Sequence, residues 1–279
     1  MIKALKRKKP FDTFLCLLTW LSAIITFFVL IFILAYIIIR GVPNLRPSLF
    51  EFTYNTTNVS LLPALITTIM TVALSLAISV PLGVFSAIYL VEYASKGNKL
   101  VKIVRMTAET LSGIPSIIYG LFGSLFFVIW LGWGISLLSG AFTLSIMILP
   151  LIMRTTEESL KAVPETYREG SFGLGAGRLR TVFRIVLPSA APGILAGIIL
   201  AIGRIVGETA ALIYTAGTVA QIPVNPTNSG RTLAIHLYAL SSEGLYTGQA
   251  YATAVVLLVV VVGINAASRA VAKKIVKNR

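Results

Sequence analysis

Long apolar runs alternate with short polar segments along the whole chain. No charged residue stands between Asp12 and Arg40, and none stands between Glu109 and Arg154. A helix needs about 20 mostly apolar residues to cross the hydrocarbon core of a membrane. The pattern therefore predicts an all-α integral membrane protein with six transmembrane helices. These spans are expected over residues 13–39, 61–91, 103–131, 136–158, 189–218 and 248–269.

Local sequence is expected to shape three places between or within these spans. The sequence GIPS at 113–116 predicts a kink in the third span, because proline removes a helical hydrogen bond and clashes with the preceding turn. The glycine-rich stretch around Trp130 and Trp133 predicts a tight turn, with both tryptophans at the membrane interface. The apolar residues between Leu233 and Leu240 predict a short helix lying at the membrane surface.

Composition agrees with a membrane protein. Hydrophobic residues make up 56% of the chain and charged residues 12%, whereas soluble domains carry about 25% charged residues. The first apolar run is longer than the apolar region of a secretory signal, about 7–15 residues, and no small-residue cleavage site follows it. It is expected to be a retained helix. Cys16 is the only cysteine, which excludes an internal disulfide.

The basic residues predict the orientation of the chain. Most of the 24 Lys and Arg residues fall in the N-terminal segment, the second-to-third connection (with Lys96), the fourth-to-fifth connection and the C-terminal segment. Six crossings place these four segments on one side, and the other side holds only Arg40, Arg46 and Arg231. Cytoplasmic connections carry an excess of Lys and Arg, so both termini are expected in the cytoplasm. The net charge of +14 then reflects topology, and no nucleic acid partner is expected.

The cytoplasmic connection at 159–188 holds the most specific motif. Its residues at fixed spacing are Glu169, Gly170, Ser171, Gly175, Leu187 and Pro188. Small residues at the front of the motif permit close approach by the backbone of another protein. A glycine tolerates a left-handed turn, and proline is accepted in the first turn of a helix. The connection is therefore expected to form a short surface helix, a turn and a second helix that leads into the fifth span.

This spacing resembles the EAA loop of the permease subunits of ABC importers, although Gly170 and Ser171 replace the two alanines. The stretches AETLSGIPSIIYGLFG (108–123) and GRIVGETAAL (203–212) resemble the phosphate-importer permeases of the PstA family. The resemblance implies a type I importer permease of the MetI-like fold. It also implies that the 169–188 loop couples this chain to an ATPase.

The resemblance implies an organisation and a set of partners. Residues 1–60 would form the basic segment, first helix and external loop, 61–270 the importer core, and 271–279 a basic cytoplasmic tail. The implied partners are a second permease subunit, a dimer of ATP-binding subunits, an extracytoplasmic phosphate-binding protein and the lipid bilayer. The expected location is the cytoplasmic (inner) membrane of a bacterium or archaeon.

The chain is not expected to be an enzyme or to bind a cofactor. It has no G-x-x-x-x-G-K-[ST] phosphate loop, so ATP and Mg²⁺ would bind to the partner ATPase. The sequence GLGAG at 173–177 lacks the third glycine of a dinucleotide-binding turn. His236 is the only histidine, which disfavours a histidine metal site or a serine–histidine triad.

Three charged residues in or near the spans are candidates for the substrate pathway. Arg204 and Glu208 are four residues apart, which puts them on one helical face within reach of each other. Such a pair is either a structural ion pair or a functional one, since charges at membrane depth are costly. Arginine suits an oxyanion such as phosphate, and Glu208 could neutralise Arg204 when no substrate is bound. Glu109 either pairs with Arg105 or belongs to the pathway.

Other functions remain open at this point. A permease for another tetrahedral oxyanion, such as sulfate or molybdate, would have the same fold. A channel or secondary transporter is disfavoured because it needs no surface for an ATPase. A membrane-embedded hydrolase is disfavoured by the single histidine and the lack of clustered carboxylates.

Overall fold

A computed structural model describes residues 10–95 and 97–277 of the chain. The basic residues expected before Pro10, together with Lys96 and residues 278–279 of the expected tail, lie outside the described residues. The described part contains helices and loops and no β-strand. The expectation of an all-α protein is confirmed.

Within the described residues, five helices are long and apolar enough to cross a membrane. They are α1 (Pro10–Gly41), α2 (Leu62–Ile88), α5 (Leu137–Lys161), α8 (Leu187–Val206) and α11 (Thr247–Lys277). Helix α2 is extended by one wide turn, η4 (Tyr89–Tyr93). Five of the six predicted spans therefore correspond to long helices, and the sixth crossing depends on a broken pair of helices.

The third predicted span is not one straight helix. Helix α3 (Lys99–Ser112) is followed by α4 (Ser116–Gly123) and the wide-turn segment η5 (Ser124–Trp130), and the two parts are bent by 103°. The break falls at residues 113–115, where Pro115 starts the new helix from an extended conformation. The predicted kink is at the right place, and the chain turns there through more than a right angle.

The fifth predicted span also ends early. Helix α8 stops at Val206, and a separate four-residue helix, α9 (Ala210–Ile213), follows after Gly207–Thr209. Gly207 is the C-cap of α8, and Thr209 (φ −123°, ψ −52°) leaves the helical path before α9. The prediction of a single helix over 189–218 is therefore wrong, and residues after Val206 do not share a helical face with residues before it.

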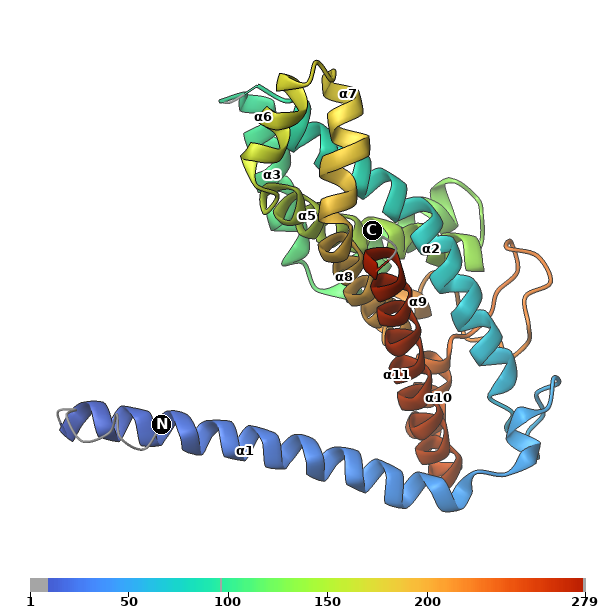
Figure 1. Cartoon of the computed structure of the whole chain (residues 1–279). Helices are drawn as coiled ribbons and strands as arrows, with labels where there is room; N and C mark the ends of the chain where they lie inside the picture. Colours follow the sequence, from blue (N-terminus) through green and yellow to red (C-terminus); the bar gives the residue numbers. More distant parts are fainter. Residues whose placement is uncertain (1–9, 96, 278–279) are drawn as a thin grey trace.

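Helices α2, α5 and α8 form the packed centre of the bundle (Figure 1). Buried hydroxyl groups line the contact between α2 and α5. The Ser75 hydroxyl donates to the Ala141 carbonyl at 3.2 Å, and the Ser145 hydroxyl donates to the Ser75 carbonyl at 3.1 Å. Small hydroxyl residues let helix backbones approach closely and hydrogen bond across the interface in a membrane. This contact is thus suited to a lipid environment.

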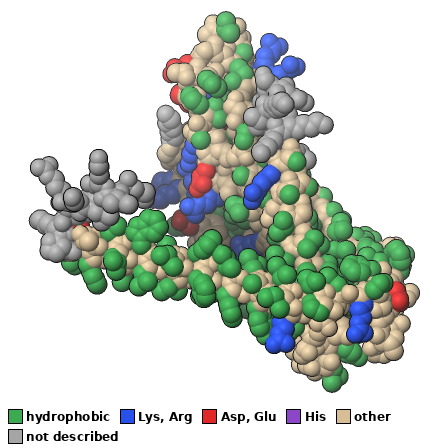
Figure 2. All heavy atoms as spheres, turned by 60° about the horizontal axis from the view of Figure 1, so that its bottom comes forward, with side chains coloured by type: hydrophobic (Ala, Val, Ile, Leu, Met, Phe, Trp, Pro, Cys, Tyr) green, Lys and Arg blue, Asp and Glu red, His purple; other side chains and the backbone are tan. Residues whose placement is uncertain are grey.

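Helix α1 stands apart from the bundle and touches it only near its C-terminal end (Figure 1). There Tyr36 packs edge-on against Tyr251 of α11, with ring centroids 5.8 Å apart. A Cβ atom at Gly41 would collide with the Tyr251 carbonyl, so glycine permits this close approach. Figure 2 shows hydrophobic side chains along the whole visible face of α1. A helix that is apolar and exposed on all sides requires an apolar environment such as lipid or another subunit.

The end of the bundle to which α1 is attached is built from two loops and one short helix (Figure 1). The first loop carries the turns η2 (Val42–Asn44) and η3 (Pro47–Phe50), and the second leads into α10 (Leu233–Glu243). The predicted helix near 233–240 is confirmed. Its residues Leu233, Ile235 and Leu240 are buried, and the Leu233 amide donates to Thr68 Oγ1 of α2 at 2.8 Å. Helix α10 thus packs into the bundle.

Candidate functional site

The motif-bearing loop forms a helical hairpin that projects from one end of the bundle (Figure 1). It consists of α6 (Glu165–Gly173), a turn, α7 (Arg178–Thr181) and the wide-turn segment η6 (Val182–Val186), which continues into α8. Gly175 lies in the turn with a φ of +79°, a conformation that disfavours residues with a Cβ. The predicted order of surface helix, left-handed glycine turn and second helix is confirmed.

The front of the motif is open to solvent. Glu169, Gly170 and Gly175 are exposed, and a Cβ atom added at Gly170 or Gly175 would meet no atom within 4 Å. Packing within this chain therefore does not require a small residue at position 170. The lack of a side chain there leaves room for the backbone of another protein.

The rest of the motif holds the hairpin together. Ser171 is buried, and its hydroxyl shares a hydrogen bond of 2.8 Å with the hydroxyl of Thr181. Leu187 packs against a buried apolar cluster that includes Val182 and Val186. Pro188 lies in the first turn of α8. These contacts place Ser171 and Leu187 on the inner side of the hairpin, whereas Glu169 and the two glycines lie on its outer side.

Exposed apolar side chains surround the open glycines. Leu174 is 91% exposed and Leu179 is 66% exposed, and the rings of Tyr167 and Phe172 are also exposed. Several exposed apolar side chains on one short hairpin are typical of a surface for protein contact. The hairpin therefore has the composition of a docking surface.

One residue of the hairpin was missed by sequence reasoning. Arg168 immediately precedes the motif, yet its side chain points inward and is buried. Its Nη2 lies 2.7 Å from Oε1 of Glu92 at the end of η4. The hydrogen bonds that Arg168 donates to the Glu92 carboxylate raise the pKa of Arg168, so the guanidinium keeps its charge despite burial. No spacing rule could find this pair because the two residues are far apart in the sequence.

A cavity of about 530 Å³ lies beside α3, α5 and α8. Its charged lining residues are Arg105, Glu109, Arg154, Glu157, Glu158, Lys161 and Arg204. The structure therefore brings two of the three predicted pathway residues, Glu109 and Arg204, to one cavity. Glu208 is not among the residues that line it.

Arg204 and Glu208 do not form the predicted pair. Among residues 10–95 and 97–277, no carboxylate lies within 4.0 Å of the Arg204 guanidinium. Because α8 ends at Val206, the spacing of four residues no longer places the two side chains on one face. Glu208 instead accepts a hydrogen bond at 3.2 Å from the Ala211 amide, at the start of α9. The expected ion pair is wrong, and with it the expectation that Glu208 neutralises Arg204.

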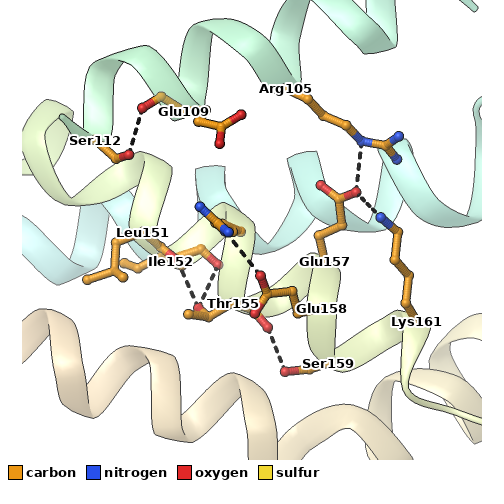
Figure 3. A network of polar contacts seen from close by, with 11 residues as sticks. Arg105, Glu109, Ser112, Leu151, Ile152, Thr155, Glu157, Glu158, Ser159 and Lys161 are labelled. Atoms are coloured by element: carbon orange, nitrogen blue, oxygen red, sulfur yellow. Dashed lines mark hydrogen bonds and ion pairs between the residues drawn. The ribbon is translucent and has the colours of Figure 1, made fainter. Parts of the chain in front are cut away.

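Glu109 does not pair with Arg105 either. Figure 3 shows Arg105 of α3 and Lys161 of α5 converging on the carboxylate of Glu157, at 2.8 Å and 2.5 Å. Glu157 is largely buried, and its pairing with Arg105 joins the broken third span to α5. Glu109 is exposed, and Figure 3 shows its carboxylate facing the space between α3 and α5. The site thus contains a guanidinium and a carboxylate, Arg204 and Glu109, that no ion pair of the described residues engages.

The glycines of α8 divide into two kinds. A Cβ atom at Gly193 or Gly197 would collide with Ser159 or Thr155 of α5, so this pair serves the packing within the chain. A Cβ atom at Gly203 would meet nothing within 4 Å, and one at Gly207 would meet only a carbonyl of its own helix. The second pair therefore lies on a surface that this chain leaves uncovered.

The buried His236 belongs to a second polar cluster, which lies between the first loop and α10. Its ring packs edge-on against Tyr54, and the Arg231 guanidinium lies 4.5 Å from the centre of the same Tyr54 ring. Burial, together with the charge of Arg231, lowers the pKa of His236 to about 3. The ring is therefore neutral and sealed from solvent, which is unsuited to acid–base work on a substrate.

A family model decides the class of the protein. Residues 79–277 match the model of the binding-protein-dependent transport system inner membrane component. The chain belongs to this family. It is a multi-pass membrane permease of the ABC importer class, which confirms the interpretation drawn from the loop motif.

Individual relatives agree with this family. The permease is 35% identical over 245 residues to the probable ABC transporter permease protein YqgI of Bacillus subtilis, and the match covers 81% of each chain. It is 32% identical over 260 residues to the phosphate transport system permease protein PstA of Haemophilus influenzae, covering 90% of each.

A solved structure agrees with the fold. A bacterial ABC transporter involved in the import of the polysaccharide alginate aligns with a TM-score of 0.69 at 17% identity. The alignment covers 94% of this chain and 96% of that one. The all-α importer permease fold is therefore confirmed.

Proposed function

We propose that this permease is the transmembrane subunit of an ATP-driven importer that carries inorganic phosphate across the cytoplasmic membrane. The observation that carries the proposal is Arg204, which lines a cavity and which no carboxylate of the described residues engages, in a chain similar to PstA over nine-tenths of its length. A guanidinium offers a planar fork of donors that matches two oxygens of phosphate.

The cavity has the charge balance that a transport site needs. Arg204 attracts an oxyanion, and the nearby Glu109 carboxylate weakens the hold on it, because like charges repel. Release is as necessary as binding in transport. The buried Glu157 is occupied by Arg105 and Lys161, so its charge is already compensated. Arg204 and Glu109 are therefore the residues that we assign to the pathway, and Glu208 supports the start of α9.

Energy would come from a partner. We assign Glu169, Gly170 and Gly175 to the contact with the ATPase, with Ser171, Leu187 and Pro188 holding the hairpin in shape behind them. ATP and Mg²⁺ would bind to the ATPase, and this chain would bind no cofactor of its own. Both termini and the hairpin would face the cytoplasm, in agreement with the distribution of basic residues.

The complete importer would contain three further kinds of chain. A PstC-like second permease would share the transport cavity and cover the open face of Gly203 and Gly207. A PstB-like ATPase dimer would receive the hairpin, and a PstS-like extracytoplasmic protein would deliver phosphate to the loops at the far end. The bilayer would surround α1 and the outer face of the bundle.

Uptake by the reconstituted complex tests this proposal. Proteoliposomes that hold the permease with its partners should accumulate radiolabelled phosphate when ATP is present, and excess unlabelled sulfate should not compete. Sulfate or molybdate uptake in place of phosphate would establish the alternative oxyanion, which an arginine can also bind. Uptake of phosphate without ATP would contradict the importer assignment.

A further inference from the structure

The inward side of α6 is fixed to the bundle by one side chain. Arg168 is only 7% exposed, whereas its neighbours Tyr167 and Glu169 on the same helix are exposed. Its guanidinium is engaged on both sides. Nε and Nη2 contact the Glu92 carboxylate at 2.7–3.3 Å, and Nη1 contacts the Val163 carbonyl at 3.0 Å. An arginine with its donors satisfied by buried acceptors is held in one geometry.

Two contacts of Arg168 reach the ends of two different membrane helices. Glu92 lies at the end of α2 in η4, and its carboxylate is itself buried. Nη2 also donates to the Leu160 carbonyl in the last turn of α5, at 3.0 Å. The last carbonyl groups of a helix lack partners within the helix, and a positive charge there is favourable. Arg168 thus joins α6 to the ends of both α2 and α5.

We propose that Arg168 is a positioning residue that makes α6 move as one body with α2 and α5, so that displacement of the hairpin by the ATPase reaches the transport cavity. The inference rests on the proposed function, since it takes the hairpin as the ATPase contact. Helix α5 supplies Arg154, Glu157 and Glu158 to the cavity wall, which gives the displacement a direct route to the site. Without the guanidinium, the hairpin could shift while the spans stay in place.

The geometry requires arginine specifically. A lysine ammonium is a point charge with a single nitrogen, so it cannot span Glu92 on one side and the two carbonyls on the other. Glu165 also contacts Nη1 at 3.2 Å, but its side chain is 73% exposed. An exposed ion pair contributes little. The buried contacts are therefore the ones that should transmit movement.

The decisive variant removes both buried charges. A lone Arg168→Met change would leave the Glu92 carboxylate buried without a partner, which can prevent folding. The double change Arg168→Met with Glu92→Leu replaces the pair by apolar groups of similar volume, which is often neutral for stability. In proteoliposomes with the partner subunits, phosphate uptake and ATP hydrolysis are measured together. We expect the double variant to assemble and hydrolyse ATP, with at least a fivefold loss in phosphate moved per ATP.

If the assembled double variant transports as much phosphate per ATP hydrolysed as the wild type, the proposal is overturned, because the pair of Arg168 and Glu92 would then serve packing alone. If the double variant does not assemble, the same ratio of phosphate transported to ATP hydrolysed is measured for the Arg168→Lys variant. A reduced ratio with normal assembly supports the proposal, and an unchanged ratio overturns it. The matched control is Glu165→Gln, which removes only the exposed contact and should keep the wild-type ratio.

The same experiments distinguish failure of the proposed function from failure of the role proposed for Arg168. If the wild-type complex transports sulfate or molybdate, the substrate assignment fails, and the same ratio can be measured with that oxyanion. If the wild-type chain does not bind an ATPase, the proposed coupling fails before any variant is compared. The assignment of Arg168 fails only when the variants and the wild type move equal amounts of substrate per ATP.

Discussion

Arg204 and Glu208 lie four residues apart in the sequence, but a helix end separates them and no ion pair joins them. Arg204 is in the last turn of α8, whereas Glu208 accepts a hydrogen bond from the Ala211 amide at the start of α9. The two charges therefore have different surroundings. Arg204 lines the cavity and Glu208 does not. Their contributions to transport should be independent.

This independence can be measured with a double-mutant cycle. A hydrogen bond to a charged group contributes about 1.5–3 kcal/mol, so Arg204→Gln should lower phosphate uptake by about ten- to a hundredfold. Glu208→Gln keeps an acceptor for the Ala211 amide and should change uptake by less than about threefold. The double variant should combine the two effects within about 0.5 kcal/mol, as residues without contact do. Recovery of uptake in the double variant would contradict this and indicate an ion pair.

The sequence predicts the apolar stretches of this fold well, because lipid demands about 20 apolar residues for each crossing. It does not predict where a helix inside such a stretch stops. Gly207 ends α8, whereas Gly197 lies inside the same helix and allows close packing on α5. Residue type alone does not distinguish these roles. The spacing rule for Arg204 and Glu208 failed for this reason, since it applies only within one helix.

Ion pairs between residues far apart in the sequence are the other feature that the sequence does not predict. The partner of Arg105 is Glu157 rather than Glu109, and the partner of Arg168 is Glu92. Each of these pairs joins elements that only the folded bundle brings together. The local parts of the hairpin were predictable, because a left-handed Gly175 and a proline at a helix start are dictated by backbone geometry.

The open surface at Gly170 allows a matched pair of substitutions. Gly170→Ala adds a Cβ that meets no atom of this chain and should stabilise α6 by about 0.5–1 kcal/mol. Transport should remain. The Cβ atom of Gly170→Trp would likewise meet no atom of this chain, and its ring would fill the space proposed for the ATPase. Co-purification with the ATPase should be lost in this variant, with the permease still inserted in the membrane. Normal co-purification of Gly170→Trp would place the contact elsewhere.

The orientation of the chain can be tested by labelling exposed positions. In a Cys16→Ser background, single cysteines at Phe52 and Asn228 should react with an impermeant thiol reagent added outside intact cells. Cysteines at Lys99 and Leu174 should react only after the membrane is opened. All four positions are exposed in the structure, so in cells that lack the partner ATPase a lack of reaction reports the side of the membrane. Labelling of Leu174→Cys from outside would reverse the proposed topology.

His236 should make the permease sensitive to acid. Its pKa is lowered from an ordinary value of 6.5 to about 3, by burial and by the charge of Arg231. Between about pH 3 and pH 6.5, His236 binds a proton in the unfolded chain but not in the folded chain. The folded state is therefore fully favoured above about pH 6.5 and loses about 1.4 kcal/mol for each unit as the pH falls toward 3.

Replacing the imidazole should remove this sensitivity. In the described structure, neither ring nitrogen of His236 has a hydrogen-bond partner. The leucine of a His236→Leu variant is similar in size to the imidazole and is apolar, so it should fit the same site. The thermal unfolding midpoint of the detergent-purified permease should fall between pH 7.5 and pH 4.5, and the fall should be smaller in His236→Leu. Tyr238→Leu, on the exposed side of the same helix, is the control and should follow the wild type. Equal acid sensitivity of the wild type and His236→Leu would contradict this prediction. It would show that the imidazole takes up a proton in the folded state, because a histidine lowers stability at acid pH only if it stays neutral when folded.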